Sequence, residues 1–423
     1  MNTFTLTNSL RNFLLVLIGI GIFSMGLTWI NDDELHSRFW SNLLHNASFF
    51  TLISLLATFF IAVCITAYAG WHTVFKRIFE AFSMFLFPGV ALMVIIALAV
   101  YFHGNHLYHW ADKAVVEADP VLKGKSSFLN VNWYLFGTLI IGGVWAWFAY
   151  KLRALSIAED HVSADPDFSS HRKMRVYAAA FLPIAGFTSC ALVWQWIMSV
   201  DSHWYSTLFA WYTLASAFVA MIALTIIVLI YLKAQGYYQN VTQEHLHDLG
   251  KFLFAFSVFW AYLWFSQFML IWYANIGEET IYFRERYDRY PVLFFANIAV
   301  NFVLPFIVLM RNDTKRKIGS LIFTAIVVFI FHWIDYFLMI KPGVHLTREE
   351  VLHHSMHSEG GHEAAAHHGS QFISGFTLPG FLELGTFLGF LGFFLIVVVF
   401  ILSKSQLTPK NDPYLQESLH HHV

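Results

Sequence analysis

The chain has little charge for its length. Charged side chains make up 12% of its 423 residues, whereas hydrophobic side chains make up 57%. Soluble domains carry about twice that share of charge, so the composition excludes an ordinary soluble protein. A net charge of −2 provides no basic surface for a nucleic acid partner. The composition therefore predicts a polytopic membrane protein whose surroundings are lipids.

Cysteine is almost absent as well. Cys64 and Cys190 are the only two, and each lies in an apolar run. They allow no CxxC pair, no CxxCH haem attachment and no ligand set for an iron–sulfur cluster. A pair of b-type haems needs several mid-span histidines on facing helices, and His332 is nearly alone at depth. No P-loop, Ser–His–Asp set or fixed zinc spacing is present either. We therefore expect no redox cofactor and no metal in this chain.

What the chain has instead is long apolar runs, each near the length of about 20 residues that a spanning helix needs. The predicted fold class is all-α, a polytopic integral membrane protein with about ten transmembrane helices. The spans are expected near 12–30, 48–69, 79–102, 132–152, 174–200, 205–232, 249–275, 290–310, 318–340 and 379–403. The fifth and sixth are joined by the short turn VDSHW.

The distribution of Lys and Arg predicts the orientation of these spans. With the N-terminus in the cytoplasm, the inner segments hold 16 of the 25 basic residues. The acidic run Asp32–Glu34 and the 278–288 stretch then fall outside. We therefore expect both termini in the cytoplasm, and in a bacterium the location would be the inner membrane.

The seventh predicted span carries polar groups along its length. It opens with His247, Asp248 and Lys251, and Tyr262, Ser266 and Gln267 follow inside the apolar run. Hydroxyl and amide groups in hydrocarbon need partners. They either bond to neighbouring helices or form a polar lane through the membrane. These six residues, together with Glu80 near the inner end of the third span, are candidates for the inner half of a proton path.

Ionisable groups near the outer ends of the spans are the other candidates, because such groups are costly in a membrane. A histidine beside a carboxylate can relay protons near neutral pH. His332, Asp335 and Tyr336 share one face of the ninth span, since they are three and four residues apart. The full outer set is Asp201, His203, Glu278, Glu279, His332, Asp335, Tyr336 and Glu383. Pinning of helix ends is the alternative role, and none of these residues is a certain catalytic group.

Histidines are concentrated in the segment 341–378. They are His345, His353, His354, His357, His362, His367 and His368. Histidine clusters can bind metal ions, but the spacing is irregular and the neighbours are Gly, Ala, Ser and Glu. The favoured interpretation is a solvated outer loop.

Two stretches resemble a known family. HDLGKFLFAFSVFWAYLWFSQFMLIWYANIGEET at 247–280 and WQWIMSVDSHWYSTLFAWY at 194–212 are similar to ActF, the membrane subunit of bacterial alternative complex III, a quinol:cytochrome c oxidoreductase. The second stretch also resembles the wider NrfD-like or polysulfide-reductase membrane anchors. One departure is Gly277, where the family is expected to have proline.

The resemblance implies two four-helix bundles with two peripheral helices. The expected division is 1–47 for the first helix and outer loop, 48–204 and 205–340 for the two bundles, 341–378 for the His-rich loop, and 379–423 for the tenth helix and tail. It also implies partner subunits. They are an ActC-like paralogous membrane subunit, subunits that carry iron–sulfur clusters and c-type haems, and in some assemblies a terminal oxidase.

Three functions remain open from the sequence. The first is a subunit of a quinol-oxidising complex that lacks redox centres of its own and supports assembly and proton translocation. The second is an NrfD-like subunit that itself binds and oxidises quinol, for example menaquinol. The third is a secondary transporter, since buried charges and paired bundles also occur there.

Overall fold

The computed structural model describes residues 3–161, 168–358 and 375–422. Within these ranges all regular elements are helices. The described residues form no strand, and one isolated β-bridge joins Thr3 and Gln406. Ten segments of the described part are long and apolar enough to cross a membrane. In hydrocarbon each backbone N–H and C=O must find a partner inside its own segment, so apolar runs of this length fold as helices. The prediction of an all-α protein with ten spans is confirmed.

The spanning helices follow the chain in order. They are α1 (Asn8–Ile30), α2 (Ser37–Thr66), α3 (Lys76–Ser83) with α4 (Leu86–Tyr101), α7 (Val131–His161), α8 (Ser169–Trp196), α9 (Thr207–Ala234), α10 (Gln243–Ala274), α12 (Pro291–Ile298) with η4 (Ala299–Val303) and α13 (Leu304–Leu309), α15 (Ile318–Ser358) and α16 (Phe381–Ser403). The short helices are η1 (Thr73–Phe75), η2 (His109–Ala111), α5 (Lys113–Ala118), α6 (Pro120–Lys125), η3 (Met198–Val200), α11 (Gly277–Arg289), α14 (Asn312–Arg316) and α17 (Leu415–Leu419).

Eight of these spans form two rings of four. In the first bundle α2 packs against α3–α4 and α8, and α7 closes the ring between α4 and α8. In the second, α9 packs against α10 and α15, and the α12–α13 segment closes the ring. The bundles meet where α2 contacts α9 and α15. Accordingly α2 and α9 are the most buried of the ten spans.

The first and last spans, α1 and α16, pack against each other beside the first bundle. They cross at Gly21 and Gly389. A Cβ atom on Gly21 would lie only 2.4 Å from the Cα atom of Gly389, so this close approach requires glycine. Small residues at a crossing let two membrane helices approach closely and gain van der Waals contact. A larger side chain at either glycine would push the two helices apart.

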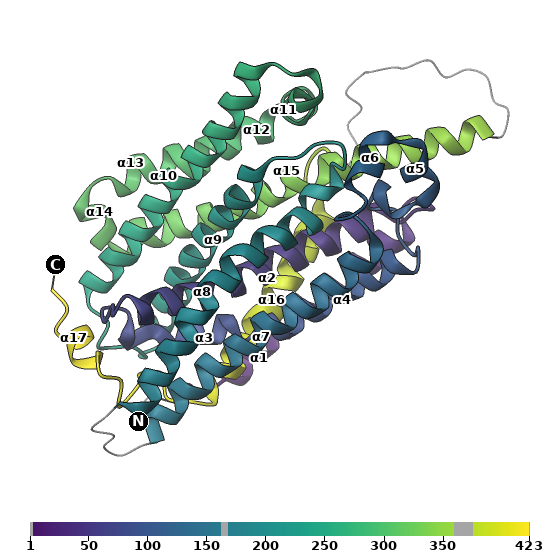
Figure 1. Ribbon diagram of the computed structural model, residues 1–423. Coiled ribbons are helices and arrows are strands. Elements are labelled where there is room, and N and C mark those ends of the chain that lie inside the picture. Colours follow the sequence, from purple (N-terminus) through teal and green to yellow (C-terminus); the bar gives the residue numbers. More distant parts are fainter. Residues whose placement is uncertain (1–2, 162–167, 359–374, 423) are drawn as a thin grey trace.

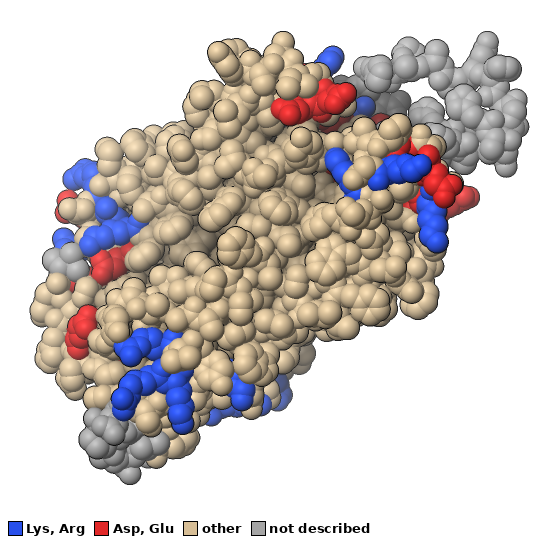
Figure 2. Space-filling view, in the orientation of Figure 1, with Lys and Arg blue, Asp and Glu red and all other residues tan. Residues whose placement is uncertain are grey.

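Both termini lie at the same end of the molecule, together with α14 and α17, whereas α5, α6 and α11 lie at the opposite end (Figure 1). Charged side chains gather at the two ends of the visible face, and a broad uncharged band lies between them (Figure 2). This band matches the region that would contact lipid tails. An even number of spans returns the chain to the side on which it began, which agrees with both termini lying at the same end.

The predicted outer loop 341–378 is wrong in its first part, because α15 continues without interruption through Ser358. Lys341 and His345, which the prediction places in solvent, are buried. The helix continues because its surface still packs here, and Ser41 and Asn42 accept hydrogen bonds from the Lys341 ammonium at 2.7 Å each. His353, His354 and His357 lie in the last turns of α15, while His362, His367 and His368 lie outside the described residues.

Candidate functional site

The second bundle holds an ionisable pair at its centre. Asp335 and His332 lie one turn apart on α15, and both side chains are 0% exposed. Apolar side chains make up most of their span, so the sequence places both groups at membrane depth. An ionisable pair in this position is rare in membrane helices and marks a functional site by default.

All four helices of the second bundle contribute to the surroundings of Asp335. On α9, the hydroxyl of Tyr212 donates to Oδ1 of Asp335, and that of Ser216 donates to Oδ2 at 2.7 Å. The indole of Trp260 on α10 donates to Oδ2 at 2.9 Å, and the amide of Asn297 on α12 donates to Oδ1 at 2.7 Å. Four donors fill the lone-pair sites of a carboxylate. The arrangement therefore stabilises the ionised form without a cationic partner in contact.

Ser216 connects the two ionisable groups of α15. Its oxygen lies 2.9 Å from Nδ1 of His332, whereas Nδ1 of His332 is 4.0 Å from Oδ2 of Asp335. Because the single hydroxyl proton of Ser216 is donated to Asp335, the serine oxygen must accept a hydrogen bond from Nδ1–H of His332. This leaves Nε2 as the bare acceptor of the neutral ring, and Nε2 has no hydrogen-bond partner among the described residues.

A second asparagine extends the network along the eighth span. The amide of Asn301 donates to the side-chain oxygen of Asn297 at 2.7 Å. Asn301 lies in η4, a short π-helical segment that ends next to Pro305. Such π-helical turns inside α-helices frequently occur at functional sites. Asn297, just before this turn, and Asn301, within it, are both buried.

A small cavity lies between this network and α11. It has a volume of about 20 Å³, enough for about one water molecule. Tyr212, Asn297, Gln267 and Arg286 contribute to its wall. The amide oxygen of Gln267 is buried and has no hydrogen-bond partner among the described side chains and backbone. The cavity therefore lies between Arg286 and two of the hydrogen-bond donors to Asp335, Tyr212 and Asn297.

Arg286 on α11 was not anticipated from the sequence. Its guanidinium donates to Asp201 at 2.9 Å and to the backbone oxygens of Leu338 and Met339 at 2.9 and 3.3 Å. Leu338 needs this donor, since residue 342 is a proline and lacks the N–H that would bond the Leu338 carbonyl within the helix. Burial lowers the pKa of Arg286, but Tyr282 and Asp201 outweigh this effect and raise it above its ordinary value.

Asp201 and His203 do not form the carboxylate–histidine pair that their spacing predicts. Asp201 bonds to Arg286, and His203 lies 2.5 Å from Asp119 of the α5–α6 connection. This hydrogen bond from His203 lowers the pKa of Asp119. The prediction of a joint relay is wrong because the turn before α9 directs the two side chains to different neighbours.

Glu383 belongs to a separate cluster at the start of α16. Arg38 donates to both of its oxygens at 2.7 and 2.8 Å, and Asn42 donates to one at 3.0 Å. Asn42 also accepts from the buried ammonium of Lys341. The cluster fastens α16 to α2 and α15. Its contacts therefore favour anchoring of helix ends over a place in the Asp335 network.

The remaining outer candidates lie apart from Asp335 or face another way. The Tyr336 hydroxyl donates to the backbone oxygen of Thr213 at 3.1 Å. Glu278 and Glu279 begin α11, where Glu278 is exposed. Acidic residues in the first turn stabilise a helix through its dipole, which accounts for their position.

Tyr262 and Ser266 share one face of α10, as their spacing predicts, but this face points away from the bundle interior. Tyr262 is 63% exposed. The interior face instead carries Ser257, Trp260 and Gln267, which are buried. Tyr262 and Ser266 therefore do not face the bundle interior as the predicted polar lane requires, whereas Gln267 is buried there.

The inner candidates fall into two groups. At the start of α10, Asp248 bonds to Lys251 at 2.8 Å and to His421 of the C-terminal tail at 2.6 Å, and the neighbouring His247 is buried. Glu80 lies in the first bundle, where it accepts from Arg77 at 2.6 Å. The inner set therefore does not form one cluster.

The sequence contained signals for several of the residues that prediction missed. Asn297 and Asn301 are four apart in an otherwise apolar span, so they share a face, as do the paired groups of α15. Pro342 in the extended ninth span leaves a free carbonyl, and a free carbonyl in a membrane requires a donor such as Arg286. Tyr212 and Ser216 give no comparable signal, because hydroxyl groups are common in membrane helices.

The fold and this network define a class: a polytopic helical membrane protein with a buried, hydrogen-bonded carboxylate–histidine pair in one of its bundles. No protein-family model and no curated protein matches the chain. The interpretation of the site therefore depends on its own geometry and on the motifs quoted above.

Proposed function

We propose that the chain is the integral membrane subunit of a respiratory quinol:cytochrome c oxidoreductase, holds no redox cofactor, and carries protons through its second bundle. The observation that supports this proposal most is the convergence of four helices on Asp335. Such a site costs stability, because a buried carboxylate loses its hydration. Proton binding and release at Asp335 would give this cost a function.

The outer half of the proposed path leads from Asp335 to the end that carries α11. A proton that leaves Asp335 passes Tyr212 or Asn297, enters the cavity beside Gln267, and reaches the surface near Asp201. One water molecule in the cavity would complete this relay. Arg286 donates to Asp201 at 2.9 Å beside this exit, so that a carboxylate lies where the path would meet the surface.

The inner half begins at Asp248, where the tail residue His421 and Lys251 meet. It continues along the interior face of α10 past Ser257, whose buried hydroxyl has no hydrogen-bond partner among the described residues. His332 is the group that would receive the proton, through its free Nε2 atom. The partner subunits, which the resemblance expects to carry iron–sulfur clusters and haem, would then control passage between the halves.

A second function has one specific observation in its favour. An apolar groove of about 340 Å³ lies between α10 and the eighth span, with Trp260, Tyr262, Ile298 and Phe302 among its lining residues. Trp260 also donates a hydrogen bond to Asp335. A quinol whose tail occupied this groove would lie one side chain from the carboxylate, which is the NrfD-like alternative. Quinone retained by the purified chain would favour it.

The purified chain alone is expected to show no haem absorption in a reduced-minus-oxidised spectrum. The reason is that both cysteines are isolated and buried, so no thioether attachment or cluster is available. The complex purified in mild detergent should show c-type haem bands from co-purifying subunits. Haem bands from the chain alone would contradict the proposal, and so would the absence of redox partners in the purified complex.

Both termini are expected to face the cytoplasm, because the inner segments hold 16 of the 25 basic residues. In a variant with Cys64 and Cys190 replaced by alanine, a cysteine at Ser370 should react with an impermeant maleimide in intact spheroplasts. His422→Cys, next to the C-terminus, is the matched control and should react only after lysis, because the C-terminus is expected in the cytoplasm. The reverse pattern would invert the orientation.

A further inference from the structure

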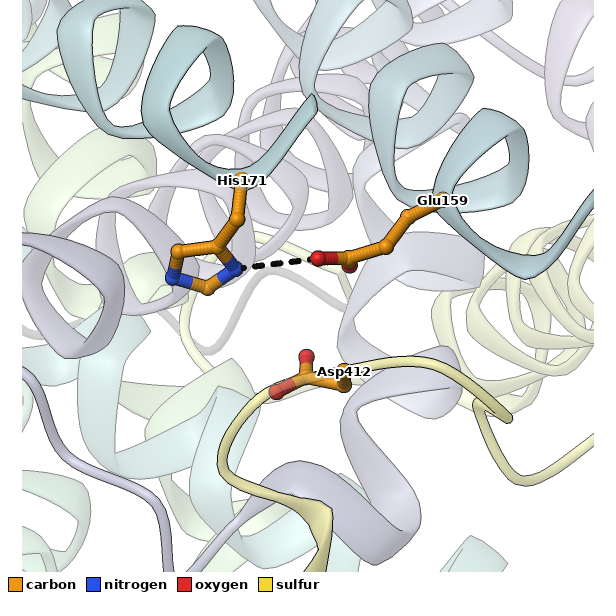
Figure 3. A group of neighbouring side chains, drawn as sticks. All are labelled: Glu159, His171 and Asp412. Atoms are coloured by element: carbon orange, nitrogen blue, oxygen red, sulfur yellow. Dashed lines mark ion pairs between the residues drawn. The ribbon is translucent and has the colours of Figure 1, made fainter. Parts of the chain in front are cut away.

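A second cluster of ligand-type side chains lies at the end of the first bundle that is near the termini. Glu159 comes from the last turn of α7, His171 from the first turn of α8, and Asp412 from the tail beyond α16. Each offers one ligand atom, and these atoms lie within 4.8 Å of one another. Figure 3 shows that the three side chains point toward a common space.

Two of these groups, Glu159 and His171, are buried without the side-chain hydrogen bonds that buried polar groups normally make. Glu159, His171 and Asp412 are 6%, 7% and 8% exposed. Neither oxygen of Glu159 and neither ring nitrogen of His171 has a hydrogen-bond partner among the described residues. Nδ1 of His171 lies 3.3 Å from Oε1 of Glu159. Unpaired buried polar atoms cost about 1–3 kcal/mol each, which makes this cluster costly unless a further ligand compensates.

We propose that Glu159, His171 and Asp412 bind a divalent transition-metal ion of the zinc class. One imidazole nitrogen and two carboxylate oxygens form a donor set that suits Zn²⁺. His72 lines the same small cavity as His171 and Asp412, and neither of its buried ring nitrogens has a hydrogen-bond partner in the described part of the chain. His72 is therefore the residue of this cavity best suited to be the fourth ligand of a tetrahedral site, and a water molecule is the alternative.

Lys76 is the cation that now balances the two carboxylates. Its ammonium bonds to Asp412 and lies 3.9 Å from Oε2 of Glu159. A divalent ion has to displace it, so lysine and metal compete for the same oxygens. Glu80, one turn further along the same helix, also attracts the charge of Lys76. The displaced ammonium therefore has an acidic neighbour.

The site joins three segments that are distant in sequence. The end of α7, the start of α8 and the C-terminal tail would share one ion, which would hold the tail across the end of the first bundle. Ser418 already fastens the same tail, since its hydroxyl accepts from Val74 N at 3.2 Å and donates to Trp71 O at 2.7 Å. The metal would act as a structural fastener, and this role does not depend on the proposed proton path.

The test uses the full chain in detergent, with the six histidines between 353 and 368 replaced by glutamine to remove competing ligands. Titration with Co²⁺ is followed by visible absorption, and displacement by Zn²⁺ gives the affinity. One tight equivalent per chain is expected, with the intense d–d bands of a tetrahedral site. His171→Ala should weaken binding at least about tenfold, because ligand loss costs no less than loss of an outer-shell partner.

Three further variants make the result specific. Asp412→Asn keeps size and should also weaken binding, and it covers the case in which His171→Ala fails to fold. His203→Ala, at an exposed histidine that also pairs with a carboxylate, should leave binding unchanged. Lys76→Met should tighten binding, because the competing cation is gone. Equal affinity in the parent, His171→Ala and Asp412→Asn proteins would overturn the proposal, as would weaker binding in Lys76→Met.

Discussion

The Asp335→Asn variant is expected to assemble with all subunits. Its turnover or its proton release should be at least several-fold lower than in the parent complex. Asparagine keeps the size of the side chain, and its oxygen can still accept from two of the four donors. It cannot bind and release a proton. The measurement is quinol:cytochrome c reductase activity in membranes, with proton release followed by a pH indicator in reconstituted vesicles.

The matched control is Asp119→Asn, a carboxylate between α5 and α6 that also bonds to a histidine. Its turnover should stay near that of the parent. Asp335→Ala serves a different purpose, because it leaves four buried donors without an acceptor at about 1–3 kcal/mol each. That variant should fail to accumulate. Unchanged turnover and proton release in assembled Asp335→Asn would leave Asp335 a structural residue and remove the second bundle as a proton path.

The ten spans could be predicted from the sequence because each depends on a local property, the length of an apolar run. His332 and Asp335 could be found for a similar reason, since two ionisable groups three residues apart inside such a run share a face. The ligands of Asp335 could not be found in this way. Tyr212, Trp260 and Asn297 lie on three other helices, and only packing brings them to one carboxylate.

The errors have the same origin. Asp201 and His203 are two residues apart, but contacts with α11 and the α5–α6 connection determine which partner each side chain meets. Tyr262 belongs to the row of polar residues in the seventh span, but the orientation of α10 within the bundle places its side chain on the exposed surface. The sequence predicts that the ninth span ends near residue 340, but α15 continues because α2 supplies two buried acceptors for Lys341. Pairing between helices, rather than composition, decides each of these cases.

Arg286→Met is expected to destabilise the protein by about 3–5 kcal/mol, the usual cost of breaking a buried ion pair from one side. The change leaves Asp201 without its cation. It also leaves the carbonyl of Leu338 without a donor, because Pro342 cannot supply one. Methionine fills a similar volume, so packing against Tyr282 should change little. A lower midpoint of thermal unfolding and faster tryptic cleavage at Arg284 in α11 are the measurements.

Two controls separate the parts of this effect. Asp201→Asn removes the charge pair but keeps the bonds from Arg286 to Leu338 and Met339, so its loss of stability should be clearly smaller. Arg286→Lys keeps the charge but lacks the fork of donors that reaches a carboxylate and two carbonyls at once, and it should lie between the two. If Arg286→Met unfolds at the same temperature as the parent, α11 does not depend on this arginine. The exit of the proposed path would then have no fixed wall, since Arg286 lines the cavity that leads from Asp335 to Asp201.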